Sequence, residues 1–286
     1  MLGPLIAWTV KAVVVFGALA ALGLVRGEAW PAVVAAIGFS LTMLVGIRRY
    51  QRISRALTDP IRPAIEECLR THISLFRGLD EAERGRFLRQ VQYLVDTLTF
   101  ETVPGVTFDE PTRVLAVAGA AMLVRGRPDY RFAKTRSVLL YPDHFSHEYD
   151  IGADHNIAGM VHHQGPIIFS KRALQKGWRR DDDAYNVSIH EWAHVLDLDD
   201  GFADGVPGFA KDLERWNEVM DRELERARSR RDTALDPYAG TDRAETFAVA
   251  TECFFEKPRA LRRKNPELYE LLVSAFNLDP CESDDG

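Results

Sequence analysis

Two long apolar runs open the chain. The first covers residues 5–25 and is broken only by Thr9 and Lys11, and the second covers residues 30–47. A helix rises about 1.5 Å per residue, so each run is long enough to cross a hydrocarbon core of roughly 30 Å, the second only just. The pattern predicts a membrane anchor at residues 1–50 that consists of two transmembrane helices.

Basic residues follow the second run directly, at positions 48–55, whereas the turn between the runs carries one Arg and one Glu. Such a basic cluster stays on the cytoplasmic side of a membrane. We therefore expect a helical hairpin with both ends inside, in a multi-pass protein of the cytoplasmic membrane whose remaining chain faces the cytoplasm. Two alternatives stay open: the first run resembles a cleavable signal peptide, and both runs suit core helices of a soluble domain.

The remaining chain, residues 56–282, is predicted to form one domain of the α+β class, mostly helical with a small sheet. Apolar spacing predicts helices between residues 51 and 100, one of them capped by Asp80, and a buried helix at 114–124. Short β-branched or aromatic runs at 137–141 and 166–170 predict strands. Between these strands, a stretch rich in His, Asp and Gly is predicted to be a surface connection, which contains His144, His147, His155, His162 and His163.

The clearest chemical signal is a His-Glu-x-x-His motif within the apolar run 187–197. Positions four apart share one face of a helix, so His190 and His194 can bind the same metal ion. Glu191 lies beside them, where it can take a proton from a water molecule at that ion. The alternative is a buried helix whose histidines bond to backbone, but leaving these groups buried and unpaired costs several kcal/mol.

A catalytic zinc site needs a third protein ligand and one open coordination position. Glu245 is the best candidate, because it lies in an apolar helical segment that follows Asp242. Glu252 is seven residues further on and shares that helix face, as an outer-shell or structural partner of the site. The competing interpretation is that Asp242 caps the helix and Glu245 completes a capping box.

Several motifs, in this order, resemble the Mlc titration factor A family of zinc metallopeptidases, of the gluzincin type. The resemblance covers about residues 70–280 and rests on residues 164–168, 190–197, 205–207 and 238–255. It implies a zincin-like fold with one catalytic Zn²⁺, bound by His190, His194 and Glu245, and with Glu191 as the catalytic acid and base. It also places Tyr238 as a phenol near the scissile carbonyl, whereas the alternative for this residue is packing with a satisfied hydroxyl.

Composition excludes some other classes of protein. The net charge of −6 argues against a nucleic-acid binder, which needs cations to neutralise phosphates. The cysteines are widely spaced, at positions 68, 253 and 281, and form neither a disulfide framework nor a cysteine-rich zinc site.

The sequence thus predicts a membrane-tethered zinc metallopeptidase that acts on a peptide or protein substrate. Residues 167–170 are predicted to be an edge strand along which an extended peptide binds. Asp197 either orients a ligand histidine or supports the end of the motif helix. The alternatives are a tethered binder that sequesters a partner such as a transcription regulator, because the family's soluble members bind the repressor Mlc, and a zinc hydrolase for other substrates.

Overall fold

The computed structural model describes residues 3–132, 135, 137–146, 150–151, 157–162, 165–180 and 182–282. The chain divides into two compact units, Met1–Pro60 and Ile61–Gly286.

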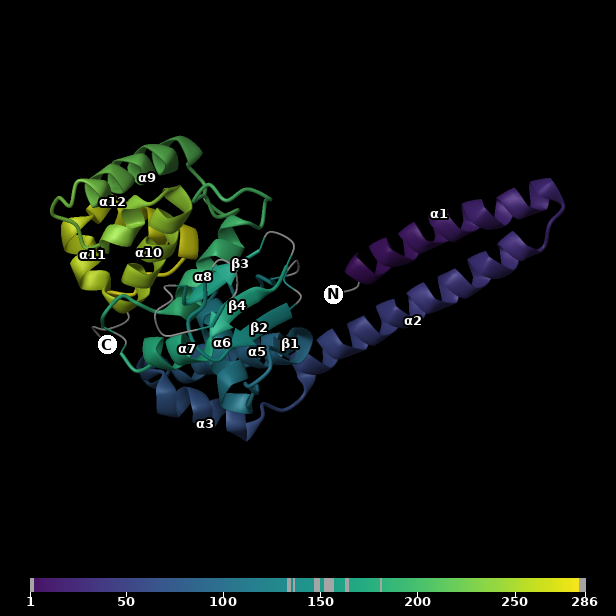
Figure 1. The fold of residues 1–286 in the computed structure, drawn as a ribbon, viewed down its shortest axis with the longest axis horizontal. Helices are drawn as coiled ribbons and strands as arrows, with labels where there is room; N and C mark the ends of the chain where they lie inside the picture. The colour runs from purple at the N-terminus through teal and green to yellow at the C-terminus, as the bar shows by residue number, and fades with distance from the viewer. Residues whose placement is uncertain are drawn as a thin grey trace. The chain divides into compact units, whose positions relative to one another are not determined.

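The first unit is a hairpin of two helices, α1 (Gly3–Arg26) and α2 (Trp30–Thr58), which lie side by side (Figure 1). The connection turns at Gly27, whose φ of +69° suits glycine. Phe16 of α1 meets Phe39 of α2 edge to face, with ring centroids 6.5 Å apart. Most of the large apolar side chains described on both helices point outward, as suits a lipid environment.

Among the described residues, α2 is the one helix long and apolar enough to cross a membrane, with a mean hydropathy of 1.9. Only 17% of its apolar window is buried, which argues against a core helix of a soluble domain. The described apolar part of α1, Thr9–Gly23, is shorter than a span. Of the two transmembrane helices predicted at 5–25 and 30–47, the described residues thus support one candidate span, and its helix runs on through the basic cluster to Thr58.

The second unit contains a mixed sheet of four strands, in the order β1-β2-β4-β3. Strands β1 (Thr99–Thr102), β2 (Ser137–Tyr141) and β4 (Ile167–Ser170) are parallel, and β3 (Gly159–Val161) pairs with β4 in the antiparallel direction. The predicted strands β2 and β4 are confirmed. The prediction that 167–170 forms an edge is wrong, because β3 lies outside β4 and takes the edge itself. A strand of three residues within a His/Gly-rich stretch is too short for an alternation of apolar and polar residues to be recognised in the sequence.

Helices cover this sheet and make up most of the unit, so the α+β class is confirmed. The predicted N-cap is also present, since the Asp80 side chain accepts a hydrogen bond from the Glu83 N–H. The helices are α3 (Pro63–His72), α4 (Ser74–Gly78), α5 (Glu81–Thr97), α6 (Glu110–Leu123), α7 (Lys171–Gly177), α8 (Val187–Asp197), α9 (Leu213–Arg228), α10 (Arg243–Glu256), α11 (Pro258–Lys264) and α12 (Pro266–Phe276), with a short 3₁₀ turn η1 (Pro237–Gly240) before α10.

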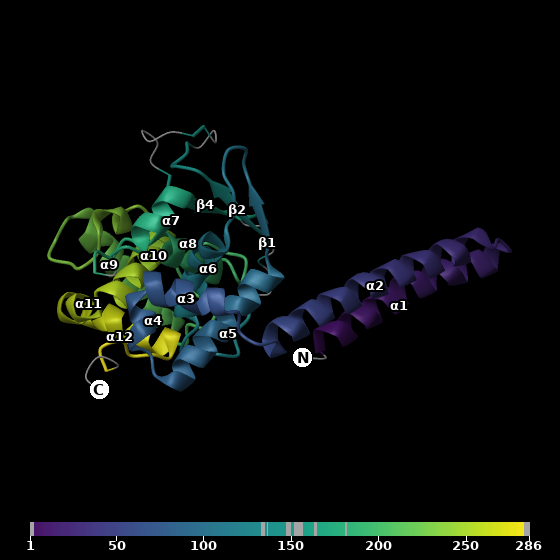
Figure 2. The same ribbon diagram turned by 90° about the horizontal axis from the view of Figure 1, so that it is seen from below.

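The motif helix α8 lies in the middle of the unit, with β3 and β4 on one side and α10 on another (Figures 1 and 2). The buried helix α6 crosses it closely at Gly119, whose N–H donates to Ser188 Oγ at 3.1 Å. Both Ser188 Oγ and the Trp192 indole donate to the carbonyl of Ala116, at 3.1 and 2.8 Å. These bonds fix the position and rotation of α8, and therefore the direction of its histidines.

Candidate metal centre

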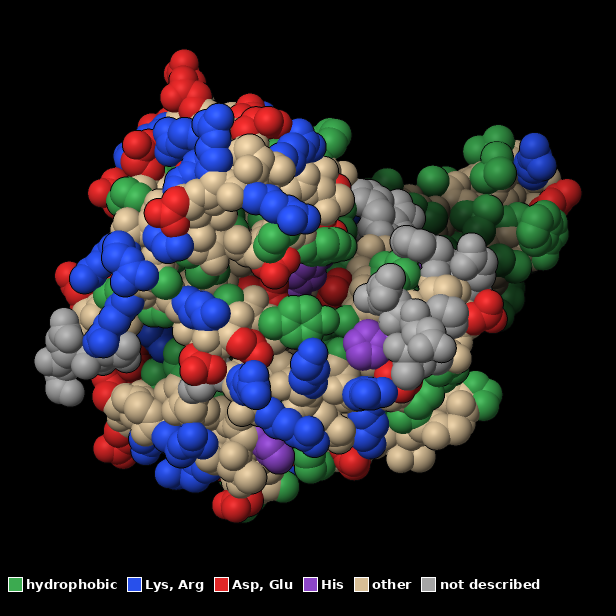
Figure 3. Space-filling model, turned by 60° about the vertical axis from the view of Figure 1, so that its left-hand side comes forward, with side chains coloured by type: hydrophobic (Ala, Val, Ile, Leu, Met, Phe, Trp, Pro, Cys, Tyr) green, Lys and Arg blue, Asp and Glu red, His purple; other side chains and the backbone are tan. Residues whose placement is uncertain are grey.

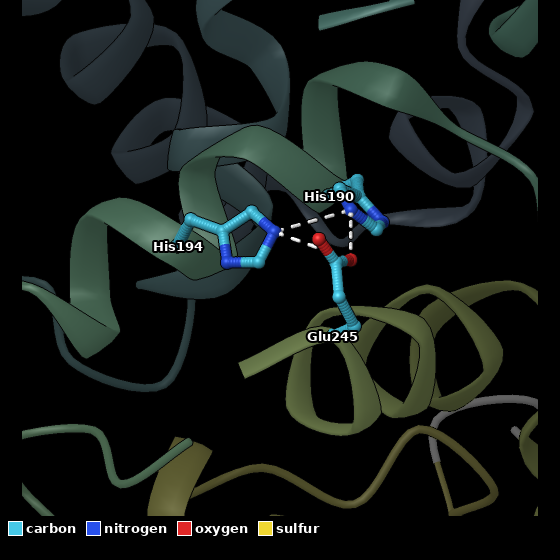
Figure 4. Close-up of side chains that lie close together, drawn as sticks. All are labelled: His190, His194 and Glu245. Carbon is cyan, nitrogen blue, oxygen red and sulfur yellow. Dashed lines mark hydrogen bonds and ion pairs between the residues drawn. The ribbon is translucent and has the colours of Figure 1, made fainter. Parts of the chain in front are cut away.

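The histidine-bearing helix α8 begins at a well-formed N-cap. The Asn186 side-chain oxygen accepts hydrogen bonds from the N–H groups of Ser188 and Ile189, at 3.1 and 3.3 Å. From this fixed start, His190 and His194 follow one turn apart, with ring centroids separated by 4.9 Å. Their side chains point toward the first turn of α10, where they meet Glu245 (Figure 4).

The donor atoms of these three side chains converge on one point. His190 Nε2 lies 3.2 Å from His194 Nε2 and 3.0 Å from Glu245 Oε2, and His194 Nε2 lies 3.5 Å from that same oxygen. Zinc bonds of about 2.0–2.1 Å in a tetrahedron would separate the donors by about 3.4 Å. Two imidazoles and one carboxylate at this spacing fit a zinc ion and leave one coordination position open.

An N-cap residue fixes the first turn of α10, and this places the Glu245 side chain next to the histidines. The Asp242 side chain accepts the Glu245 N–H at 2.9 Å, so the predicted N-cap is present. A capping box would also require the Glu245 side chain to turn back toward Asp242. It points to the histidines instead, so only half of the capping interpretation holds and the carboxylate is available as a ligand.

Glu252 holds His190 from the side opposite the convergence point. His190 Nδ1 lies 2.9 Å from Glu252 Oε2, and the main-chain N–H of Asn186 donates to Glu252 Oε1 at 2.5 Å. A proton on Nδ1 leaves Nε2 with its lone pair free for a metal. Burial lowers the pKa of His190, but the charges and hydrogen bonds of Glu252 and Glu245 raise it well above its ordinary value. Glu252 thus contacts the ring nitrogen of His190 that faces away from the convergence point, a position that suits an outer-shell or a structural partner.

Glu191 is buried between α8 and the sheet edge. Burial raises the pKa of its carboxyl to about 7 against the opposing charges of His190 and His194. It lies against Gly159 of β3, where a Cβ atom would come within 2.5 Å of Glu191 Oε1. Sequence reasoning missed Gly159, because a glycine in a glycine-rich stretch carries no sign that a carboxylate packs on it.

Tyr238 lies in η1 with its ring beside His190, at 6.1 Å between centroids. Its hydroxyl donates to Glu245 Oε1 at 3.3 Å. The side chain is 54% exposed, so it is not a packing residue of the core. Partial burial and the neighbouring Glu245 carboxylate raise its pKa to about 12, so the phenol remains a hydrogen-bond donor at neutral pH.

The model of one protein family, described as glucose-regulated metallo-peptidase M90, matches residues 47–277. The chain belongs to this family. Mlc titration factor A of Cronobacter sakazakii is 33% identical over 226 residues, which cover 73% of this chain and 84% of that protein. Mlc titration factor A of Yersinia enterocolitica is 27% identical over 228 residues, with the same coverage of 73% and 84%. An uncharacterized protein of Synechocystis is 26% identical over 264 residues, 84% of this chain and 96% of its own length.

These matches confirm the family that the motifs resemble. The family description suggests a metallopeptidase-like protein with a metal ion, which agrees with the His-His-Glu cluster of this M90 chain. Two of these relatives are named Mlc titration factor A, and this name suggests a regulatory role.

Tyr185 is a further residue at this M90 site that sequence reasoning missed. Burial, followed by the charges of Glu252 and Glu191, raises its pKa, and its side chain is 43% exposed. Lys176 of α7 lies over its ring, 4.9 Å from the centroid. Figure 3 shows Lys and Arg side chains gathered below a hollow in which a histidine lies between acidic groups. Tyr185 is a single tyrosine just before the N-cap of α8, and nothing in the sequence indicates that it lies near the acids of the site.

Two other predictions have mixed outcomes. Asp197 accepts the N–H of Val206 at 2.9 Å, which holds the loop after α8 and supports the structural role over orientation of a histidine. In the stretch predicted to be a surface connection, His144 bonds to neighbouring Asp143. His147, His155 and His163 lie outside the described residues, as does Gln164 at the start of one family motif.

We expect Glu252→Gln to weaken zinc binding about 10- to 100-fold. Glu252 accepts one hydrogen bond at each oxygen, from Asn186 and from His190, whereas glutamine has a single acceptor oxygen and would turn its NH₂ toward one of these donors. The measurement is the zinc dissociation constant, by competition with a chromogenic chelator. Glu218→Gln on the exposed face of α9 is the matched control; equal affinity in both variants would refute the role of Glu252.

Proposed function

We propose that this protein is a zinc-dependent metallopeptidase that hydrolyses peptide bonds. The observation that carries the proposal is the meeting of His190 Nε2, His194 Nε2 and a Glu245 carboxylate oxygen at mutual distances of 3.0 to 3.5 Å. The buried acid Glu191 beside them adds the one group that such hydrolysis still needs, a general base.

A zinc ion held by His190, His194 and Glu245 would activate a water molecule and polarise the substrate carbonyl. Glu191 would take the proton from the attacking water and return it to the leaving amine. Burial suits this exchange, because a carboxyl with a pKa near neutrality gives and takes a proton with similar ease. The Tyr238 hydroxyl is a donor at the same place and would stabilise the oxygen that gains negative charge.

The substrate would lie along β3, the strand at the edge of the sheet and next to Glu191. An extended peptide can add to a free sheet edge through main-chain hydrogen bonds. Gly159 would then have two roles. Its lack of a side chain leaves room for Glu191, and it also lets the backbone of a peptide approach the strand.

We also propose that α2 tethers the enzyme to the cytoplasmic membrane. Its exposed apolar face and hydropathy support a span, and the arginines at 48–55 would stay on the cytoplasmic side. The second unit follows these arginines directly and would therefore act on cytoplasmic peptides or proteins.

A second candidate function is a tethered binder of a transcription regulator, in which peptidase activity is incidental. The name Mlc titration factor A, carried by relatives up to 33% identical, favours it. A pull-down with wild-type protein and with Glu191→Gln separates the two proposals. A binder retains its partner in both forms, whereas a peptidase retains a protein only as a trapped substrate of the Gln variant.

The proposed activity is tested by metal analysis together with peptide cleavage. We expect about one zinc per chain, loss of peptide cleavage when a chelator removes the metal, and recovery when zinc is restored. Ester substrates run in parallel distinguish a hydrolase of another class. Cleavage that continues after complete metal removal would contradict the proposal, as would a metal-loaded protein that cleaves no peptide in a broad library.

A further inference from the structure

The C-terminal ends of two helices, α9 and α11, meet although they are distant in the sequence. The segments that meet are the loop at 229–232, directly after α9, and the last turn of α11 at 262–264. Arg226 joins them, because its Nη2 donates to the carbonyl of Lys264 at 3.0 Å and also to the carbonyl of Asp232. Lys264 Nζ in turn lies 2.6 Å from Asp232 Oδ1. These bonds fix the two segments relative to each other.

Four exposed arginines lie on this junction and form what we call the arginine patch. Arg230 and Arg231 come from the loop, and Arg262 and Arg263 come from α11. Within the part of the chain that the structure describes, none of these four side chains makes a hydrogen bond or an ion pair. Their guanidinium groups therefore remain available to a partner in solution.

The acids on the adjoining turns do not neutralise the arginine patch, because each is already paired with another cation. The pairs are Glu223 with Arg226 at 3.0 Å, Glu225 with Arg228 at 2.8 Å, Asp232 with Lys264 at 2.6 Å and Glu267 with Arg222 at 2.9 Å. The hydrogen bond from Lys264 lowers the pKa of Asp232, and the charges of Arg226 and Arg263 lower it further. The junction thus has a local excess of positive charge on a chain whose net charge is −6.

Helix ends give a structural reason for some basic residues, since cations near a C-terminus offset the helix dipole and bond to carbonyls that lack a partner. Arg226 has this role at the junction. Arg228 has it too, because it donates to the carbonyls of Gly240 and Thr241 at 2.9 and 3.1 Å. The arginine patch makes no such bonds, so helix capping explains the bonded cations and not the four exposed ones.

Arg230 occupies a backbone position that normally belongs to glycine. Helix α9 ends in a Schellman turn, in which the Arg230 N–H donates to the carbonyl of Ala227 and the Arg231 N–H to that of Arg226, both at 3.1 Å. Arg230 has a φ of +50°, in the left-handed region, where a Cβ atom clashes and glycine does not. The turn would be more stable with glycine, so the fold itself gives no reason for an arginine here.

We propose that the arginine patch binds an acidic segment of a partner protein. Guanidinium groups pair with carboxylates through two parallel hydrogen bonds, and the junction presents four of them from two fixed segments. A nucleic acid fits less well, because its phosphates would continue past the patch over a chain of net negative charge. A membrane surface also fits less well, since no exposed large apolar side chain among those described lies in the patch.

The strength of this binding follows from its exposure. Each exposed ion pair contributes little, and salt screens it over a Debye length of about 10 Å at 0.1 M. We therefore expect weak, strongly salt-dependent binding that speeds association and selects the partner. The proposal does not depend on peptidase activity, because it concerns other residues and other chemistry.

Fluorescence anisotropy of the full chain in neutral detergent tests the patch with two labelled peptides, one with six glutamates and one with glutamines in their place. All proteins carry Glu191→Gln, so that no probe is cleaved. We expect the glutamate peptide to bind about 10-fold more tightly or better in low salt, and to lose most of this affinity at about 0.2 M salt. Equal affinity of the two peptides would overturn the proposal.

Two double variants assign the binding to the arginine patch. Arg262→Gln with Arg263→Gln should weaken the glutamate peptide about 5-fold or more. Arg179→Gln with Arg180→Gln is the matched control, because it removes two consecutive exposed arginines elsewhere in the same unit, and it should leave the affinity unchanged. Equal losses in the two variants would overturn the proposal. A DNA duplex that binds more tightly than the peptide, and through Arg262 and Arg263, would overturn the choice of a protein partner.

Arg230→Gly separates binding from stability. Relief of the left-handed strain should raise Tm by about 1–4 °C, whereas loss of one guanidinium should weaken the glutamate peptide about 2-fold or more. A residue with only a structural role does not give this combination of a more stable protein and weaker binding. Unchanged peptide affinity in Arg230→Gly would count against the patch as the binding surface and overturn the proposal.

Discussion

Replacing Glu191 by Gln should reduce kcat for peptide cleavage by about 10²- to 10⁴-fold and leave zinc bound at the wild-type stoichiometry. Glutamine has the size of glutamate, so the packing of this side chain against Gly159 is preserved. It cannot accept the proton of the attacking water. The loss should therefore appear in kcat, measured with a quenched fluorescent peptide, and not in metal content.

Two comparisons make this result specific. Glu214→Gln changes an exposed acid at the start of α9 and should have wild-type activity. His194→Ala should lose both zinc and activity, because it removes one of the three converging donors. Turnover of Glu191→Gln within a few-fold of the wild type would show that the proton is handled elsewhere and would exclude the proposed general base.

The part of the site carried by α8 could be predicted because it depends on short-range geometry alone. The four-residue spacing of His190 and His194 sets their common face in any α-helix. Glu245 is different, since its approach depends on how α10 packs against α8, and no periodicity in the sequence encodes that packing. Its helical segment made Glu245 the best candidate but left the capping alternative open, the family resemblance favoured the ligand role, and the distances to both histidines support it.

The features that sequence reasoning missed all depend on contacts between distant segments. Strand β3 has three residues and exists as a strand because β4 offers it an edge. The contact of Gly159 with Glu191 and the position of Tyr185 near the acids of the site likewise arise only when the sheet, α7 and α8 assemble. A local pattern gives the type of an element, whereas its neighbours decide which side chains reach a site.

The crossing of α6 and α8 explains how a helix with an ionisable cluster is held in place. At Gly119 the two backbones approach so closely that a Cβ atom would lie 2.5 Å from the carbonyl carbon and oxygen of Ser188 and 2.7 Å from the nitrogen of Ile189. These are main-chain atoms of a helix, which cannot move aside as a flexible side chain can. The missing side chain at Gly119 thus sets the depth at which α8 sits, two residues before the first zinc-ligand candidate, His190.

Gly119→Ala should therefore destabilise the second unit, although alanine is the better helix former by about 1 kcal/mol. Overpacking a tight core costs about 1–3 kcal/mol and more where rigid backbone is involved, so we expect a net loss of about 2 kcal/mol or more. At about 2–4 °C per kcal/mol, Tm should fall by roughly 4–8 °C. Thermal unfolding of the full chain, followed by tryptophan fluorescence, measures it.

Gly85→Ala is the matched control for this substitution. Gly85 also lies inside a helix, α5, but a Cβ atom there would meet nothing within 4 Å. The helix propensity of alanine should then act alone and raise Tm by up to a few degrees. The two substitutions are chemically identical, so opposite signs would isolate the α6–α8 contact as the cause. A Gly119→Ala protein as stable as Gly85→Ala, with unchanged zinc affinity, would show that α8 is not held by this crossing.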